Sequence, residues 1–141
     1  MLVLASKQVA VRLARPDEGA LVRDLQKNSG GGVEIADLDW SDIGHHWLVA
    51  EYDGAPVGCI CVLYGKPVSF FHEMYVDRTE PHRVQALTVR TLLLAALASC
   101  REYGSVMAHG LIPHQLTSYK RALERRGAIK WYDGSSYIVR L

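Results

Sequence analysis

A strand pattern that leads directly into a long helical pattern is the feature that most constrains the fold of this chain. Val68 to Val76 is rich in aromatic and β-branched residues, a composition typical of a strand. The polar loop Asp77 to His82 follows and contains Pro81. Val84 to Tyr103 then places apolar residues on neighbouring helical turns, and Gly104 directly after it is a typical helix end. We therefore predict a strand, a loop and a long helix over residues 68–103.

The segments on either side of this unit predict further strands and helices. Asp53-Gly54 separates two apolar strand patterns and predicts a hairpin turn. The acidic segment 34–42 is open to two interpretations, a short helix or a loop. Three consecutive strands before a crossover helix favour one mixed sheet of six to seven strands, with helices on both faces. The further predicted elements are strands at 9–13, 47–52, 57–64, 105–109, 128–132 and 137–141, and helices at 15–28 and 116–126.

Length and composition fit a single globular domain over residues 1–141. The hydrophobic fraction is 49% and the charged fraction 22%, which argues against a disordered chain. A formal net charge of +1 gives no global field that would attract nucleic acid or a membrane surface. The apolar run Leu92 to Ala98 is far shorter than a bilayer span, and the N-terminal residues lack the pattern of a signal peptide. We therefore expect a cytoplasmic protein.

The cysteines and histidines do not predict a metal site. The chain has three cysteines, Cys59, Cys61 and Cys100, and this odd number at these spacings fits neither a disulfide framework nor a zinc knuckle. Small buried hydrophobic residues are the simpler interpretation. The six histidines show no spacing typical of metal ligands.

The residues around position 76 and those of the last predicted helix form two short motifs. The first is Glu73-Met74-Tyr75-Val76-Asp77, followed by Arg83-Val84-Gln85-Ala86-Leu87-Thr88, and the second is Ala122-Leu123 with Gly127. These motifs, and the order of elements from Val9 onward, resemble the GNAT superfamily of acyl-CoA-dependent N-acyltransferases. In that family a strand with an acidic residue is followed by a glycine-containing motif that opens a long helix. The resemblance implies an α/β fold with a GNAT-like mixed central sheet.

The resemblance also implies a binding site for acetyl-CoA as acyl donor. A helix N-terminus leaves backbone N–H groups unpaired and carries a partial positive charge, so a pyrophosphate binds there favourably. In the family the pantetheine arm binds the backbone of the preceding strand, and Met74 and Val76 would supply those groups here. The residues matching the family's phosphate motif are Arg83, Val84, Gln85, Ala86, Leu87 and Thr88.

This motif departs from the family pattern at several positions. Ala86 replaces the first glycine and Thr88 the glycine or alanine, so added methyl groups would crowd a phosphate. Arg78 stands where a proline is usual, and the loop before the helix is longer. Positive charge on Arg78, His82 and Arg83 would compensate. The alternative is a helix start that no longer binds a cofactor.

Two residues carry the predicted chemistry. An amine with a pKa of about 10.4 must lose a proton before it attacks a thioester, so the reaction needs a base. The family places an acidic residue on the central strand for this, and Glu73 matches that position; a solvated strand carboxylate is the alternative. The family's usual acid is a tyrosine at the position of Leu123. Tyr119, one turn earlier on the same helix face, would substitute for it, or is a packing residue.

The acceptor and the partners are less sharply defined by the sequence. The family shapes its acceptor pocket with the segment after the first helix, where Asp37, Asp39, Asp42 and Trp40 would favour a cationic small-molecule or peptide amine. A second interpretation is a non-catalytic GNAT-fold protein that serves as a binding or structural subunit, for example in a phage virion. The expected protein partners are a second copy of the chain or a larger protein complex. A third is a nucleic-acid-binding module that uses the basic run 120–126, although a solvated helix face explains that run better.

Overall fold

The computed structural model describes residues 9–30, 46–111, 117–130 and 136–141. Along the chain, the described elements are β1 (Val9–Leu13), α1 (Gly19–Asn28), β2 (Trp47–Tyr52), β3 (Ala55–Leu63), β4 (Val68–Val76), α3 (His82–Tyr103), β5 (Met107–Leu111), α4 (Thr117–Glu124), β6 (Ile129–Lys130) and β7 (Ser136–Arg140). Every predicted strand and helix is present, and those at 9–13, 47–52 and 68–76 have the predicted bounds. The acidic segment 34–42 lies outside the described residues.

Several element boundaries differ from the prediction, and two of these differences have a clear local cause. The first helix begins at Gly19 instead of Arg15, because Arg15 and Glu18 form a turn in which the Glu18 N–H donates to the Arg15 carbonyl (3.1 Å). The strand after α3 begins at Met107 instead of Ser105. Gly104 has a φ of +103°, and the Ser105 N–H donates back to the Cys100 carbonyl (3.0 Å), so Ser105 still belongs to the helix end.

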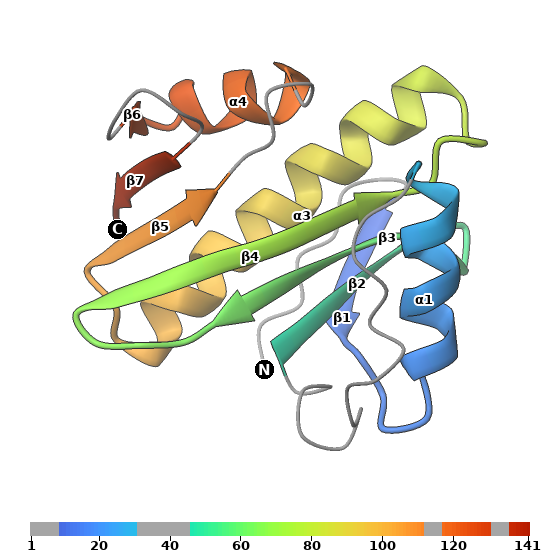
Figure 1. Cartoon of the computed structure of the whole chain (residues 1–141), viewed down its shortest axis with the longest axis horizontal. Coiled ribbons are helices and arrows are strands. Elements are labelled where there is room, and N and C mark those ends of the chain that lie inside the picture. The colour runs from blue at the N-terminus through green and yellow to red at the C-terminus, as the bar shows by residue number, and fades with distance from the viewer. Residues whose placement is uncertain (1–8, 31–45, 112–116, 131–135) are drawn as a thin grey trace.

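The described strands form one mixed sheet of seven strands in the order β1-β2-β3-β4-β5-β7-β6 (Figure 1). The pairing of β4 with β5 is parallel, and all the other neighbouring pairs are antiparallel. The β2–β3 hairpin turns at Asp53 and Gly54, which have φ values of +50° and +82°, as the predicted turn requires. The predicted mixed sheet with a crossover helix is confirmed.

Helices cover both faces of the sheet, and each face has its own core. On one face α3 buries Leu92, Leu93 and Ala96 against β1, β2 and β3, and Leu123 of α4 joins this core. On the other face α1 buries Val22 and Leu25 in a second apolar cluster. The sheet partners in that second cluster are Trp47, Val49, Cys59, Cys61 and Tyr75.

The helix α3 is a core element of this sheet. By length and composition alone His82–Tyr103 is apolar enough to cross a membrane, but half of that stretch is buried inside the protein. Its apolar residues therefore have a partner in the sheet, as expected for the central helix of an α/β domain.

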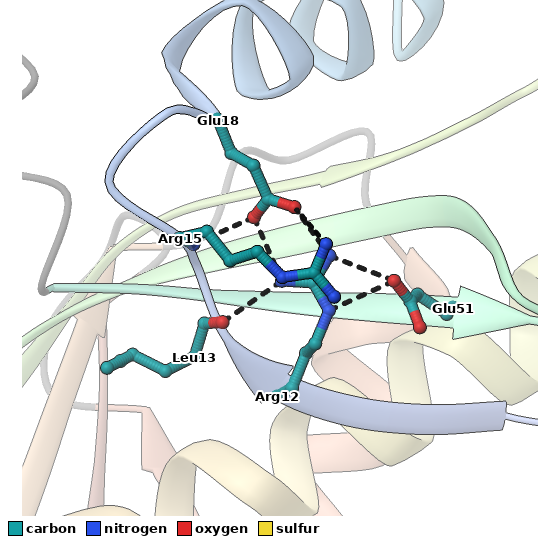
Figure 2. Close-up of polar contacts among 5 residues, drawn as sticks. All are labelled: Arg12, Leu13, Arg15, Glu18 and Glu51. Carbon is teal, nitrogen blue, oxygen red and sulfur yellow. Dashed lines mark hydrogen bonds and ion pairs between the residues drawn. The ribbon is translucent and has the colours of Figure 1, made fainter.

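A buried ion pair fixes the start of α1 relative to β1 and β2 (Figure 2). The Arg12 guanidinium donates to both carboxylate oxygens of Glu18, at 2.9 and 2.6 Å, and its Nε donates to Glu51 Oε1 at 3.0 Å. Glu18 is 8% exposed and also accepts from the Arg15 backbone N–H at 2.8 Å. The Arg12 hydrogen bonds hold the pKa of the Glu18 carboxyl below its usual value of 4.5. The N-terminal turn of α1 is thus held on the sheet by charge-assisted hydrogen bonds.

Candidate active site

The central feature of the site is a strand pair that separates halfway along. β4 pairs with β5 from Val68↔Met107 to Phe71↔Gly110, and β4 then continues to Val76 without a β5 partner in the described part of the chain. Figure 1 shows β5 turning away from β4 toward the end where α3 begins. We call the edge of β4 at residues 72–76, which has no β5 partner in the described part of the chain, the opening. This edge and the N-terminus of α3 lie at the same end of the sheet (Figure 1).

The ladder between β3 and β4 shows which backbone groups face this opening. The Asp77 N–H donates to the Val57 carbonyl (2.9 Å), and bonded and non-bonded pairs alternate along an antiparallel ladder. Met74, opposite Ile60, and Val76, opposite Gly58, are therefore non-bonded positions. Their backbone N–H and C=O groups point away from β3, toward the side of β5. Both residues occupy the places predicted for binding a pantetheine arm.

The N-terminus of α3 keeps its first backbone donors directed at the same end of the sheet. Pro81 is the N-cap, and its carbonyl accepts from the N–H groups of Val84 (2.9 Å) and Gln85 (3.0 Å). The N–H groups of His82 and Arg83 precede these first helical bonds, so they are the ones an anion would meet. The Gln85 side chain donates to the carbonyls of Arg78 (3.2 Å) and Glu80 (2.7 Å). Gln85 thus stabilises the loop.

Two residues depart from the glycine motif, and one of them, Thr88, packs in the core. Thr88 is fully buried, its hydroxyl donates to the Val84 carbonyl at 2.7 Å, and its methyl group faces Gly58. The expectation that the Thr88 methyl group would crowd a phosphate is therefore wrong, because position 88 faces the sheet. Ala86 is exposed and adds only one methyl group at the surface. Val84 is buried and Leu87 is half-buried against the core, so these residues offer a cofactor mainly their backbone.

Two basic residues near the loop, Arg78 and Arg83, contact other elements of the protein. Arg78 lies at the C-terminal end of α1, where its N–H donates to the Asn28 carbonyl (3.1 Å) and its guanidinium packs on Gly30. The Arg83 Nη2 donates to the Tyr52 hydroxyl at 3.4 Å. His82 is exposed. Arg78 lies in the loop before α3, and His82 and Arg83 lie in its first turn; their role toward a pyrophosphate remains a prediction.

A β-bulge sets the direction of Glu73. Ile60 pairs with Met74 and Val62 with Phe71, so β4 has one more residue than β3 over this stretch. Phe71 belongs to the core beneath α3, whereas Tyr75 belongs to the cluster beneath α1. Glu73 lies two residues before Tyr75 and shares its face. Its half-buried carboxylate accepts a hydrogen bond from the Tyr75 hydroxyl through Oε2.

Two thiols lie near Glu73 in the cluster beneath α1. Burial raises the pKa of Cys61 to about 12, and the charge of Glu73 adds to this effect. Burial also raises the pKa of Cys59 well above its usual value. Both cysteines are free thiols, as the sequence predicts, and both are neutral near neutral pH. Within the described residues no group of histidines, cysteines and acids could hold a metal ion.

The other predicted site residues are only partly placed. Tyr119 lies on α4, but its side chain is outside the described part of the structure. Leu123, at the position of the family's usual tyrosine, is 1% exposed and belongs to the core beneath α3. The acidic residues 37, 39 and 42 are outside the described ranges, so their role in acceptor binding remains a prediction. Tyr75 was missed as a site residue, although strand alternation places it on the face of Glu73.

Comparison with solved structures identifies the fold. The chain matches PaiA N-acetyltransferase from Thermoplasma acidophilum, solved with coenzyme A, at a TM-score of 0.71 and 15% identity over 94% of this chain and 99% of that one. Diaminobutyrate acetyltransferase EctA from Paenibacillus lautus, solved with L-2,4-diaminobutyric acid and coenzyme A, matches at 0.70 and 15% over 96% of both chains. N-acetylglutamate synthase from Neisseria gonorrhoeae matches at 0.67 and 13% over 97% of this chain, which spans 36% of that enzyme.

The fold and the separated strand pair define a class, the GNAT N-acetyltransferase fold. This chain has that fold, which confirms the predicted α/β architecture. No protein-family model matches the sequence, and the search of curated proteins found no match. The likeness is therefore one of structure, at identities of 11–18%.

Proposed function

We propose that the protein is an acetyl-CoA-dependent N-acetyltransferase that acts on a primary amine. The observation that carries this proposal is the separation of β4 from β5 after Phe71, at the end of the sheet where α3 begins. It exposes the backbone of Met74 and Val76 beside a helix N-terminus. An extended chain ending in a pyrophosphate fits both halves of this arrangement.

Acetyl-CoA fits the groups that line this end of the sheet. Met74 and Val76 offer backbone hydrogen bonds to the amide groups of a pantetheine arm. The first-turn N–H groups of α3, with Arg83 and His82 nearby, offer donors and positive charge to the phosphates. Acetyl-CoA supplies a thioester carbonyl as the electrophile.

Glu73 serves as the general base in this proposal. The acceptor must lose a proton to attack the thioester, and a carboxylate at the β4 bulge lies on the strand that borders the opening. The proton passes from the ammonium group to Glu73, directly or through one water molecule. Tyr119 is proposed to protonate the departing thiolate, from the helix position one turn before Leu123.

The first experiment measures cofactor binding without assuming catalysis. A ligand that binds only the folded state at one hundred times its Kd stabilises it by about 2.7 kcal/mol. For 141 residues with an unfolding entropy of about 2.1 cal/mol/K each, that corresponds to a rise in Tm of about 9 °C. We expect this rise with millimolar acetyl-CoA, and no change in Tm would contradict the proposal.

The second experiment tests the base. Glu73→Gln should lower kcat about 10² to 10⁴-fold in a thiol-release assay, because general base catalysis is lost. Its Tm should stay close to that of the wild type, since Gln keeps the size of the side chain. Glu102→Gln, at an exposed position near the end of α3, is the matched control and should keep full activity. Equal turnover by the Glu73 variant and the wild type would refute the assignment.

The acceptor class can be tested with amines taken from the structural neighbours. L-glutamate, L-2,4-diaminobutyric acid and a peptide with a free N-terminus cover acidic, cationic and peptidic acceptors. The aspartates 37, 39 and 42 lead us to propose that the cationic amine reacts fastest. Near-equal rates for the acidic and cationic amines would remove this part of the proposal.

A non-catalytic subunit with the same fold is the second candidate. Leu123 favours it, because this buried leucine stands where the family's usual acid would be. A protein of this kind would show no turnover with any of the three amines and no stabilisation by acetyl-CoA. Stabilisation by acetyl-CoA without turnover of any of the three amines would instead favour a subunit that is kept for binding.

A further inference from the structure

We propose that Tyr75 is the positioning residue for the Glu73 carboxylate, an inference that rests on the proposed function of Glu73 as general base. Tyr75 does not face the reacting amine in this assignment. It acts through Glu73, by holding that side chain in the rotamer suited to proton transfer.

Strand alternation places Glu73 and Tyr75 on one face, and the bulge in β4 decides which face that is. Without an extra residue between Phe71 and Met74, the alternation of the strand would place Glu73 on the face of Phe71, in the core beneath α3. With it, Glu73 and Tyr75 share the face beneath α1 at a spacing of two residues. The Tyr75 hydroxyl donates to Glu73 Oε2 across this short gap.

The ring of Tyr75 is held in place by packing, so its hydroxyl is a fixed donor for Glu73. Tyr75 is 6% exposed, and its ring stacks on Trp47 with centroids 5.9 Å apart and planes 19° from parallel. Packing of this kind leaves one rotamer and one position for the hydroxyl. Glu73 is half-buried and has three rotatable side-chain bonds, whose freedom costs free energy to restrict. A fixed donor restricts them before the substrate arrives.

The Tyr75 hydroxyl keeps its proton near neutral pH, so it can donate to Glu73 throughout that range. Burial, and secondarily the hydrogen bond to Glu73, raise the pKa of Tyr75, so the phenol stays protonated at neutral pH. The thiols of Cys59 and Cys61 lie near Glu73 on β3 and are neutral as well. In the described part of this face, the phenol is therefore a donor that ionisation does not remove near neutral pH.

Tyr75→Phe tests the role because it removes the hydroxyl and keeps the stacked ring. We expect kcat to fall about tenfold, the loss typical for a hydrogen bond to a charged group, with the KM for acetyl-CoA unchanged. Tyr103→Phe, at an exposed tyrosine far along α3, should change neither quantity.

A double variant separates positioning from packing. In the Glu73→Gln background, Tyr75→Phe should have no further effect on kcat, since the group it positions is gone. An equal loss of kcat in both backgrounds, or a wild-type kcat for Tyr75→Phe, would overturn the inference.

The failure of the proposed function would be visible separately, as a wild-type protein with neither acetyl-CoA binding nor turnover. Carbon NMR of the Glu73 carboxylate then reads the contact directly. Its chemical shift should differ between Tyr75→Phe and the wild type because the hydrogen bond is lost, and identical shifts would refute the contact.

Discussion

Adding one methyl group at Gly58 probes how closely α3 packs on the sheet. A Cβ at this position would lie 2.7 Å from Thr88 Cγ2, 2.9 Å from the Tyr75 carbonyl oxygen and 3.2 Å from Leu92 Cδ1. The carbonyl oxygen cannot retreat without disturbing the β3–β4 ladder, in which Cys59 pairs with Tyr75. Overpacking a core typically lowers the free energy of unfolding by about 1–3 kcal/mol. Because one of the close contacts is with a backbone atom, we expect Gly58→Ala to cost about 3 kcal/mol.

The assay is thermal unfolding of matched variants. With an unfolding entropy of about 2.1 cal/mol/K per residue over 141 residues, a cost of about 3 kcal/mol lowers Tm by about 10 °C. Thr88→Ser removes the methyl group that makes the shortest contact and keeps the hydroxyl that donates to Val84. Gly58→Ala should therefore cost at least about 1 kcal/mol less in the Thr88→Ser background than in the wild type. Additive effects, or an unchanged Tm for Gly58→Ala, would refute this account of the packing.

Two further predictions concern stability. Because the pKa of Glu18 is lowered in the folded state, its ion pair with Arg12 stabilises the protein above the unfolded-state pKa. This stabilisation is lost as the pH falls through the lower folded-state pKa. Arg12→Met should remove this acid dependence, measured as Tm against pH from neutral to acid. Leu92→Ala should cost about 3 kcal/mol in urea unfolding because Leu92 is fully buried, whereas Leu63→Ala, at a 37% exposed position, should cost less than half of that.

Most of the fold follows from local patterns in the sequence. The strands at 47–52 and 68–76 could be predicted residue for residue, because runs of β-branched and aromatic residues end at turn residues such as Asp53 and Gly54. The starts of α1 and β5 could not, because they depend on hydrogen bonds of Glu18 and Ser105 within local turns. Such bonds compete with helix and strand without changing the hydrophobic period.

The site was less predictable, since it depends on how strands meet. The end of the β4–β5 pairing at Phe71 and the bulge before Met74 are properties of register, which one strand's own sequence does not determine. The burial of Thr88 could have been predicted, because Val84, Thr88 and Leu92 are four residues apart and share the buried face of α3. The roles of Tyr119 and of residues 37–42 remain predictions.

The short β4–β5 seam also shapes how the protein opens. Four residue pairs, from Val68↔Met107 to Phe71↔Gly110, are the only strand contact between the β1–β4 half and the β5–β7 half of the described sheet. Few backbone bonds need to break for the C-terminal half to separate, whereas β2 and β3 are paired on both edges. Amide hydrogens in β5 and β7 should therefore exchange by sub-global opening, and those in β2 and β3 only on complete unfolding. A ligand bound between β4 and β5 would contact both halves of the sheet and oppose their separation. It would therefore slow amide hydrogen exchange in strands that it does not contact.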